Sequence, residues 1–518
     1  MNRDSRTKNV LRNIVGGIGA QLFTTVLSFV CRTIFIKLLG ATYLGVNGLF
    51  SNILSMLSLA ELGIGSAIVF SMYKPIAEND ERHVAKLMNF YRTAYRIIAV
   101  AVAVCGLALT PFLEVLIKED TSQIQDLKLI YLLILSNTAV SYLVAYKGAM
   151  LNADQKNYVV VIIKNIFAVI QNGLQIVVLI VFNSFIAYLI VQIITTLMTN
   201  VVQAVYVNQK YPFLVAYKKE RIDTVERKSI LKNVRGMMMH KIGGFVLNGT
   251  DNLIISGLVG VVSVGLYSNY LMIITIVRSY ITQITGATTA SVGNLIAKET
   301  SQKSYEIFKI IFFAYNGIYS FCFVSFYVLF QPFIEWWIGK EYLLSDAVVF
   351  IVLINFYLNG MQGCINNFTN ATGLFWETRY KPVIECTINL GVSIWLAKSI
   401  GLPGVFIGTL ASFLATFWIN PKLVYRKQFN RSSCSYFLRF GLYSAITVGS
   451  ALGLRYVLDA LLREATIWTL LIRAVFCVIT PMAVLTALFK NTEEYNYSKR
   501  LIESIIQTAC RKVSRKKG

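Results

Sequence analysis

Charged residues are scarce in this 518-residue sequence, because Asp, Glu, Lys and Arg make up only 14% of it while hydrophobic residues make up 56%. With a mean hydropathy of +0.60, the chain has too little polar surface for a soluble globule of this size. We therefore expect a protein that is embedded in lipid.

Groups that carry out catalysis are equally scarce. The sequence holds two histidines, His83 and His240, and eight cysteines without a CxxC pair, so we expect neither a zinc site nor disulfides. It contains no Walker-type glycine-rich loop, no HExxH and no Gly-x-Ser-x-Gly motif. The sequence thus predicts no enzyme, no cofactor and no bound metal.

Long apolar windows dominate the chain instead. A membrane-spanning helix needs about 20 mostly apolar residues, and the windows here are too long and too unalternating for barrel strands. We predict fourteen spans, or twelve if the last two windows lie at the membrane surface. The windows lie at residues 12–39, 43–73, 93–117, 127–150, 157–182, 184–207, 236–260, 263–287, 306–330, 344–371, 381–400, 403–422, 436–458 and 466–489.

The first twelve windows show signs of a duplication. Gly48–Leu54 returns as Gly265–Leu271, 217 residues later, and Asn152-Ala153 returns as Asn370-Ala371 at an offset of 218. Internal repeats in a polytopic chain are typical of secondary transporters, in which two bundles move about a shared site. The predicted fold is an all-α polytopic membrane protein with two six-helix lobes related by an internal repeat, followed by two C-terminal helices.

The net charge of +23 raises the question of a nucleic-acid partner. The basic residues lie in short loops between apolar runs rather than on one face, so we expect no nucleic acid. Because basic loops stay on the cytoplasmic side, their alternation places both termini in the cytoplasm. The predicted parts are an N-terminal lobe at 1–207, a basic cytoplasmic linker at 208–235, a C-terminal lobe at 236–422, two extra transmembrane helices at 423–489 and a basic amphipathic tail at 490–518.

The linker and the tail both carry apolar residues among their basic ones. The linker pattern suits a helix on anionic cytoplasmic lipid, and a solvated basic linker fits it equally well. For the tail, the apolar face of Leu501, Ile502, Ile505 and Ile506 favours anchoring at the membrane surface.

Ionisable residues inside spans are costly and therefore informative. Lys37, Lys147, Arg455 and Arg473 lie close enough to span ends to reach the headgroups. Arg278 lies about 15 residues into its window, near the middle of the bilayer at about 1.5 Å per residue. The candidate buried cations, in decreasing order of interest, are Arg278, Arg32, Lys164 and Lys241.

Two carboxylates, Glu61 and Asp251, also lie well inside spans. Each either pairs with a cation and holds helices together, or couples transport to H⁺ or Na⁺. A polar stripe follows helical spacing in the window 344–371 and faces either a hydrated cavity or neighbouring helices. It consists of Asn355, Asn359, Gln362 and Asn366. Together with Gln171, Asn172 and Gln175 in another span, it makes an interior compatible with sugars.

Four segments resemble the oligosaccharide flippases of the multidrug/oligosaccharidyl-lipid/polysaccharide exporter superfamily. They are Asn9–Gly40, Ala60–Ala67, Leu151–Lys156 and Thr250–Ser256, and the resemblance extends over essentially the whole chain. It implies a cationic cavity that carries undecaprenyl-diphosphate-linked sugar repeat units from the inner to the outer leaflet of a bacterial cell membrane. Such a role belongs to capsule or exopolysaccharide synthesis.

This resemblance assigns roles to the candidate residues. Arg278, Arg32, Lys241 and Lys164 would bind the substrate diphosphate, because guanidinium groups bind phosphate oxygens in pairs. An ion gradient or the membrane potential would drive transport, with membrane lipids and polysaccharide polymerase machinery as further partners. The alternatives are a lipid II or teichoic-acid precursor flippase, a multidrug exporter of the same fold, and a membrane-embedded glycan polymerase or glycosyltransferase. Cavity cations would repel the organic cations that drug exporters carry, and the outer loops are short for an enzyme.

Overall fold

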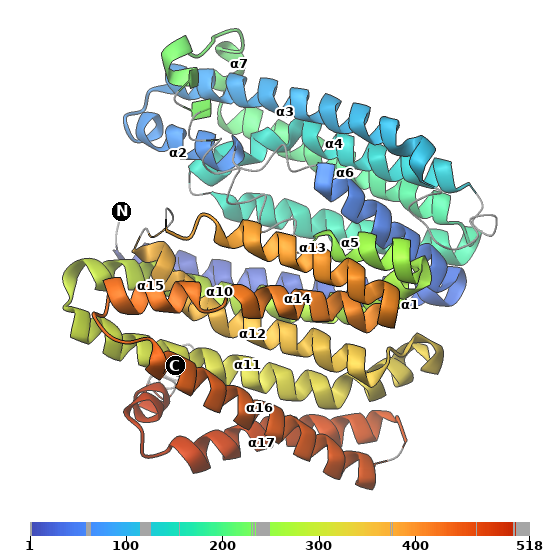
Figure 1. The fold of residues 1–518 in the computed structure, drawn as a ribbon. Coiled ribbons are helices and arrows are strands. Elements are labelled where there is room, and N and C mark those ends of the chain that lie inside the picture. Colours follow the sequence, from blue (N-terminus) through green and yellow to red (C-terminus); the bar gives the residue numbers. More distant parts are fainter. Residues whose placement is uncertain are drawn as a thin grey trace, which may run out of the picture. The chain divides into compact units, whose positions relative to one another are not determined.

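The computed structural model is built almost wholly of helices (Figure 1). It describes residues 3–57, 64–113, 126–154, 156–228, 230–231, 234, 249–372, 374, 377–462, 464–500 and 503. No strand occurs in these ranges, as expected where lipid offers no partners for backbone groups. The predicted all-α membrane fold is confirmed.

Two compact units, Met1–Ser268 and Asn269–Gly518, divide the chain. Unit 1 holds α1 (Arg3–Leu57), α2 (Ile64–Ala77), α3 (Glu81–Leu109), η2 (Thr110–Phe112), α4 (Leu127–Ala153), α5 (Asn157–Phe182), α6 (Phe185–Lys210), α7 (Phe213–Ala216), α9 (Asp251–Ile254), η4 (Ile255–Val259) and the start of α10 (Val261–Lys298). The predicted lobe boundaries at 207 and 236 remain a prediction.

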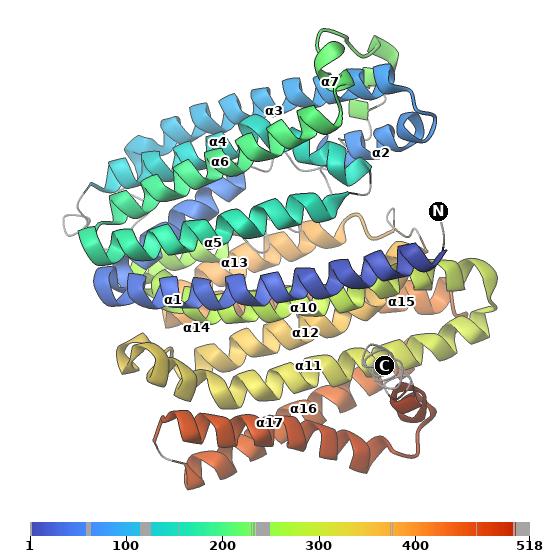
Figure 2. The same ribbon diagram turned by 180° about the vertical axis from the view of Figure 1, so that it is seen from behind.

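Unit 2 holds the rest of α10 and the helices that follow it. These are α11 (Ser301–Ile338), η5 (Lys340–Tyr342), α12 (Asp346–Ala371), α13 (Lys381–Ile400), α14 (Leu402–Thr416), α15 (Ile419–Lys427), α16 (Cys434–Leu461) and α17 (Ile467–Phe489). Helix α11 packs against α12, α16 and α17, an arrangement visible from both sides (Figures 1 and 2).

Twelve helices among the described residues are long and apolar enough to cross a membrane. Two of the fourteen predicted windows have no separate counterpart among these twelve helices. Helix α1 breaks at Gly40, where φ is 80°, a conformation that glycine adopts without steric cost. The windows 12–39 and 43–73 lie on either side of this break and are joined in one helix, and the first half of the window 236–260 lies outside the described residues. The last two windows form α16 and α17, and both meet the requirement.

Glycine also sets the packing of α1 against the start of α10. A Cβ atom at Gly45 would overlap the backbone carbonyl of Val261, and one at Gly265 would overlap the carbonyl of Ala41. Only glycine permits this backbone approach, and small residues are typical of close helix contacts in membranes. The repeated Gly48 and Gly265 segments thus lie in a region where helix packing is tight.

The described part of the linker is docked on α3. Asn89 donates its amide to the carbonyl oxygens of Tyr217 and Glu220, at 2.9 and 3.0 Å. The carboxylate of Glu220 also accepts from Arg82 at 2.7 Å. These bonds join the described part of the linker to α3 within unit 1, and its predicted position on lipid or in solvent remains a prediction. The apolar tail face lies outside the described residues.

Candidate functional site

A cavity of about 520 Å³ lies within unit 1, between α3, α4, α5 and α6. Its walls come from helices that pack side by side (Figures 1 and 2). Among the described residues that line it, Lys164 of α5 alone is charged. The lining residues with polar side chains are Tyr91, Tyr95, Ser141, Tyr142, Asn152, Lys164, Gln171, Thr196, Thr199, Asn200 and Gln203.

Hydroxyl and amide groups give this cavity its chemistry. Gln171 accepts a hydrogen bond from Thr195 at 3.1 Å, and Asn200 donates to the carbonyl of Val140 at 3.1 Å. Both contacts fix the amides on the helices and leave further donors and acceptors for a ligand. Tyrosine rings beside amides suit a polar ligand with apolar faces, which describes a sugar ring.

Lys164 is the predicted cation that reaches this cavity. Its side chain is exposed, and within the described part of the chain it makes no ion pair. An ammonium without a carboxylate partner is available to an anionic ligand group. As far as the described residues show, the cavity therefore combines one cation that makes no ion pair with a polar, neutral wall.

Arg32 of α1 lies in unit 1 but is not among the residues that line the cavity. Its Nη2 atom donates to the hydroxyl of Ser268 at 2.5 Å. The neighbouring Cys31 is buried and its sulfur lies 4.0 Å from Oε1 of Gln175. Arg32 is thus partly buried and held in place by α10.

Arg278 lies on α10 in unit 2, inside the candidate span Val261–Thr282. Its guanidinium carbon is 5.8 Å from the centre of the Phe356 ring of α12. The side chain is exposed, and the described residues provide it with no ion pair. A cation–π contact weakly orients a guanidinium but leaves its N–H groups free.

Asp251 begins the short helix α9. Its Oδ1 atom is shielded from solvent and has no hydrogen-bond partner among the described residues. A buried carboxylate oxygen without a partner is costly, and both predicted roles of Asp251 remain predictions. The other candidate carboxylate, Glu61, and the remaining candidate cation, Lys241, lie outside the described residues.

The polar stripe of α12 makes bonds between helices. Asn355 donates to the carbonyl of Phe406 in α14 at 2.9 Å, and Asn366 accepts from Asn420 of α15 at 2.7 Å. Gln362 accepts from Lys381 of α13 at 3.3 Å. Asn359 instead donates to the carbonyl of Asn355 at 2.8 Å, within α12. These contacts correspond to the helix-to-helix alternative, and the cavity role of the stripe remains a prediction.

Sequence reasoning missed the tyrosines of the unit 1 cavity. Tyr91 and Tyr95 stand one helical turn apart on α3, and their hydroxyls are 3.3 Å apart. Tyr142 of α4 packs its ring 6.0 Å from that of Tyr95. The i, i+4 spacing of the first two was the available signal, but nothing in the sequence brings α4 beside them.

The sequence profile of the polysaccharide biosynthesis protein family matches residues 10–291, more than half of the chain. The chain belongs to this family. The match confirms the resemblance inferred from the sequence. No curated protein sequence matches the chain significantly.

Solved structures share the fold at low sequence identity. A lipid II flippase, MurJ, in an inward closed conformation has a TM-score of 0.67 and 14% identity, covering 92% of this chain and 99% of that one. An inward-facing multidrug resistance MATE family transporter of the MOP superfamily has a TM-score of 0.59 and 15% identity, covering 76% and 93%. The MATE transporter VcmN of Vibrio cholerae, in the bent form, has a TM-score of 0.53 and 15% identity, covering 82% and 98%. The chain thus shares the fold of these solved transporters and of this flippase.

Proposed function

We propose that the protein is a flippase that moves undecaprenyl-diphosphate-linked oligosaccharide repeat units from the cytoplasmic to the outer leaflet. Transport occurs by alternating access and is driven by an ion gradient or the membrane potential. The unit 1 cavity carries this proposal, because its wall of tyrosine, amide and hydroxyl groups suits a sugar. Membership of the polysaccharide biosynthesis family supports the same substrate class.

Free cations on spanning helices supply the second part of the substrate site. Arg278 and Lys164 make no ion pair within the described residues. A diphosphate provides several oxygens that accept charge-assisted hydrogen bonds from such groups. In this proposal Arg278, Arg32, Lys241 and Lys164 are each candidates to bind the diphosphate, as predicted from the sequence, whereas the lipid tail stays in the bilayer.

The energy for this movement has no nucleotide source in the sequence, which lacks a phosphate-binding loop. The membrane potential supplies about 2.3 kcal/mol per charge per 100 mV. Asp251, with its unpartnered oxygen, is the group that exchanges H⁺ or Na⁺ in this proposal. Alternatively it serves only to pin neighbouring helices together.

A lipid II or teichoic-acid precursor flippase would use the same diphosphate chemistry, and the sugar part distinguishes these substrates. A multidrug exporter would have to bring an organic cation beside Arg278, which costs Coulomb energy. The geometry therefore favours an anionic lipid-linked substrate over a cationic drug.

The experiment is to deplete the protein from cells and to count undecaprenyl-diphosphate oligosaccharide in each leaflet by leaflet-selective labelling. Accumulation on the cytoplasmic side, with loss of surface glycan, is expected. Accumulation of lipid II instead would assign the protein to that substrate. An unchanged leaflet distribution of both lipids, together with sensitivity to cationic drugs, would contradict the proposal.

A further inference from the structure

Four basic side chains lie together where α3, α4 and the linker meet in unit 1: Arg92, Arg96, Lys147 and Lys218. Nη2 of Arg92 donates to the carbonyl of Lys218 at 3.1 Å. Arg92 and Arg96 both interact electrostatically with the phenol of Tyr146. Lys147 interacts electrostatically with Arg92 and Lys218. We call these four residues the α3–α4 cation cluster.

The cluster has no acidic partner in the described ranges, where none of its four members makes an ion pair. The situation differs nearer the start of α3. There Arg82 pairs with Glu220 at 2.7 Å, and His83 lies 2.8 Å from Glu226. Two acidic side chains of the linker, Glu220 and Glu226, are thus engaged by the beginning of α3. Like charges held close together repel, so an external anion would stabilise the cluster.

The side chain of Lys147 is held in place by contacts with neighbouring residues. Its Nζ atom donates to Oδ1 of Asn208 in α6 at 2.5 Å and lies 5.6 Å from the centre of the Tyr146 ring. The side chain is partly buried. Its sequence position near a span end predicted only that it would reach the headgroups. The structure adds a contact with α6, and two of its three N–H groups are uncommitted to any described residue.

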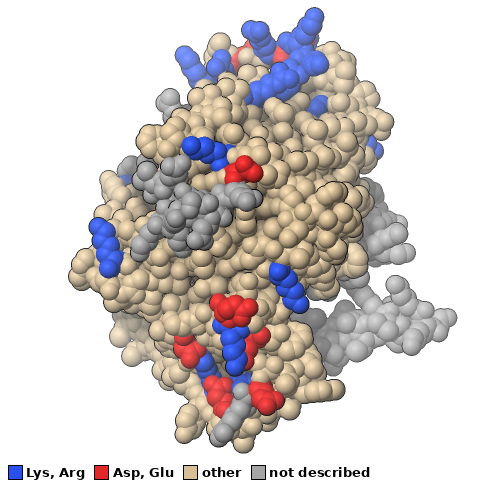
Figure 3. All heavy atoms as spheres, turned by 90° about the vertical axis from the view of Figure 1, so that its right-hand side faces the viewer, with Lys and Arg blue, Asp and Glu red and all other residues tan. Residues whose placement is uncertain are grey.

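The depth of the cluster matches that of lipid headgroups. Lys147 precedes the end of α4 at Ala153 by six residues, or about 9 Å along a helix. The predicted topology places this end of α4 at the cytoplasmic leaflet. Lys and Arg side chains gather in Figure 3 at the part of unit 1 where α3 and α7 lie. Several donors gathered near the end of α4 suit a phosphate, which accepts hydrogen bonds from all sides.

We propose that the α3–α4 cation cluster is a binding site for the phosphate of a lipid headgroup in the cytoplasmic leaflet. Arg92 and Arg96 contribute planar guanidinium donors, Lys147 and Lys218 contribute ammonium groups, and the Tyr146 phenol lies beside them. Two lipids carry this chemistry: an anionic phospholipid of the bulk membrane, and a polyprenyl diphosphate. The site is distinct from the cavity lining, which includes none of the four residues, and it does not depend on the proposed transport function.

The test uses the full-length purified protein and measures which lipids stay bound in native mass spectrometry. The protein is offered phosphatidylglycerol, undecaprenyl diphosphate or zwitterionic phosphatidylcholine, each at the same concentration. The variants are Arg92→Gln and Lys147→Gln. Arg82→Gln is the matched control, because it removes a cation from the same helix that already has an acidic partner. Lys147→Arg keeps the charge and serves as the rescue.

Each removed cluster cation should lower retention of the bound lipid about fivefold, the effect of one basic residue at an anionic surface. The control and the rescue variant should retain it. Preference for phosphatidylglycerol would identify a bulk phospholipid site, and preference for undecaprenyl diphosphate would identify a polyprenyl site. Equal retention of phosphatidylcholine, or equal losses in Arg82→Gln, would overturn the proposal. A variant that fails to fold would be replaced by Lys218→Gln, whose side chain is exposed.

Discussion

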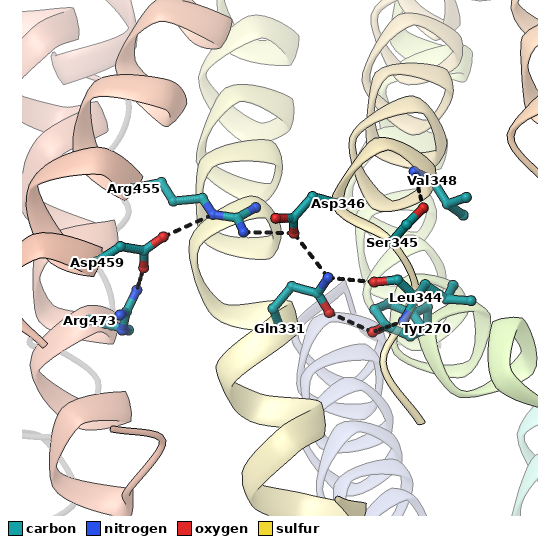
Figure 4. A network of polar contacts seen from close by, with 9 residues as sticks. All are labelled: Tyr270, Gln331, Leu344, Ser345, Asp346, Val348, Arg455, Asp459 and Arg473. Atoms are coloured by element: carbon teal, nitrogen blue, oxygen red, sulfur yellow. Dashed lines mark hydrogen bonds and ion pairs between the residues drawn. The ribbon is translucent and has the colours of Figure 1, made fainter. Parts of the chain in front are cut away.

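Arg455 of α16 donates from Nη2 to Oδ1 of Asp346 at the start of α12, at 2.7 Å, across 109 residues of sequence. The bond is one link of a chain of polar contacts in unit 2 (Figure 4). On one side Asp459 accepts from Arg455 at 3.2 Å and from Arg473 at 2.7 Å. On the other side Gln331 donates to Asp346 at 3.0 Å. This polar network joins the two C-terminal helices, α16 and α17, to α11 and α12.

From this polar network we predict that Arg455→Ala weakens the packing of α16 and α17 against α11 and α12. The arginine side chain is 16% exposed, whereas that of Asp346 is 62% exposed, so water screens the pair in part. We expect a loss of about 1 kcal/mol in the free energy of unfolding. Thermal unfolding in detergent would measure it. Lys74→Ala, which removes a largely exposed i, i+4 pair, should leave stability unchanged. An equal loss in both variants would contradict the role of the polar network.

Helix packing at Gly45 gives a second prediction. Gly45→Ala forces a Cβ into the backbone carbonyl of Val261, which no side-chain rotation relieves. We expect a destabilisation of about 1–3 kcal/mol, as for other overpacked positions. Gly173→Ala in α5 is the control, because nothing lies within 4 Å of its Cβ position. There alanine should stabilise the helix by about 0.5–1 kcal/mol. The opposite signs of the two effects, read from unfolding temperatures, make the comparison decisive.

A third prediction concerns how the stability of the segment after α17 depends on pH. Burial opposes ionisation of Glu494. The hydrogen bond from Arg439 at 2.8 Å and the ion pair with Lys309 at 3.7 Å outweigh it and hold the pKa of Glu494 below the ordinary value. A carboxyl group with a lowered pKa stabilises the fold fully at pH values above the ordinary pKa of Glu, about 4.3. This contribution is lost as the pH falls through the lowered pKa.

Wild-type protein should therefore lose more stability than Glu494→Gln when the pH is lowered from 7 to below about 4.3. Unfolding temperatures at several pH values would measure the difference. Glu464→Gln, in the described segment between α16 and α17, is the control. Parallel curves for wild type and Glu494→Gln would show that this carboxylate does not contribute.

Sequence and structure agree where the determinant is local. Apolar windows, Gly40 and the family motifs follow from residues close together in the chain, so the all-α membrane fold and the family were predictable. Contacts between segments that are distant in the sequence were not predictable. Arg455 and Lys147 were set aside as residues that reach the headgroups, because spacing along one helix cannot reveal Asp346 on α12 or Asn208 on α6. The cavity tyrosines escaped notice for the same reason.

Arg278 gives the prediction on which the transport proposal most depends. Its guanidinium has no ion pair among the described residues and rests beside Phe356, so its removal strands no carboxylate and should not impair folding. If it binds the diphosphate, Arg278→Gln loses charge-assisted hydrogen bonds of about 1.5–3 kcal/mol, which corresponds to a fall in transport rate of about tenfold or more. Arg278→Lys keeps the charge but not the planar fork, and should retain an intermediate rate. The measurement is the leaflet distribution of the lipid-linked oligosaccharide in cells that contain equal amounts of each variant. Phe356→Leu, which removes the ring but keeps the cation, should transport normally. Full transport by Arg278→Gln would remove this residue from the substrate site and leave the diphosphate to Arg32 and Lys164.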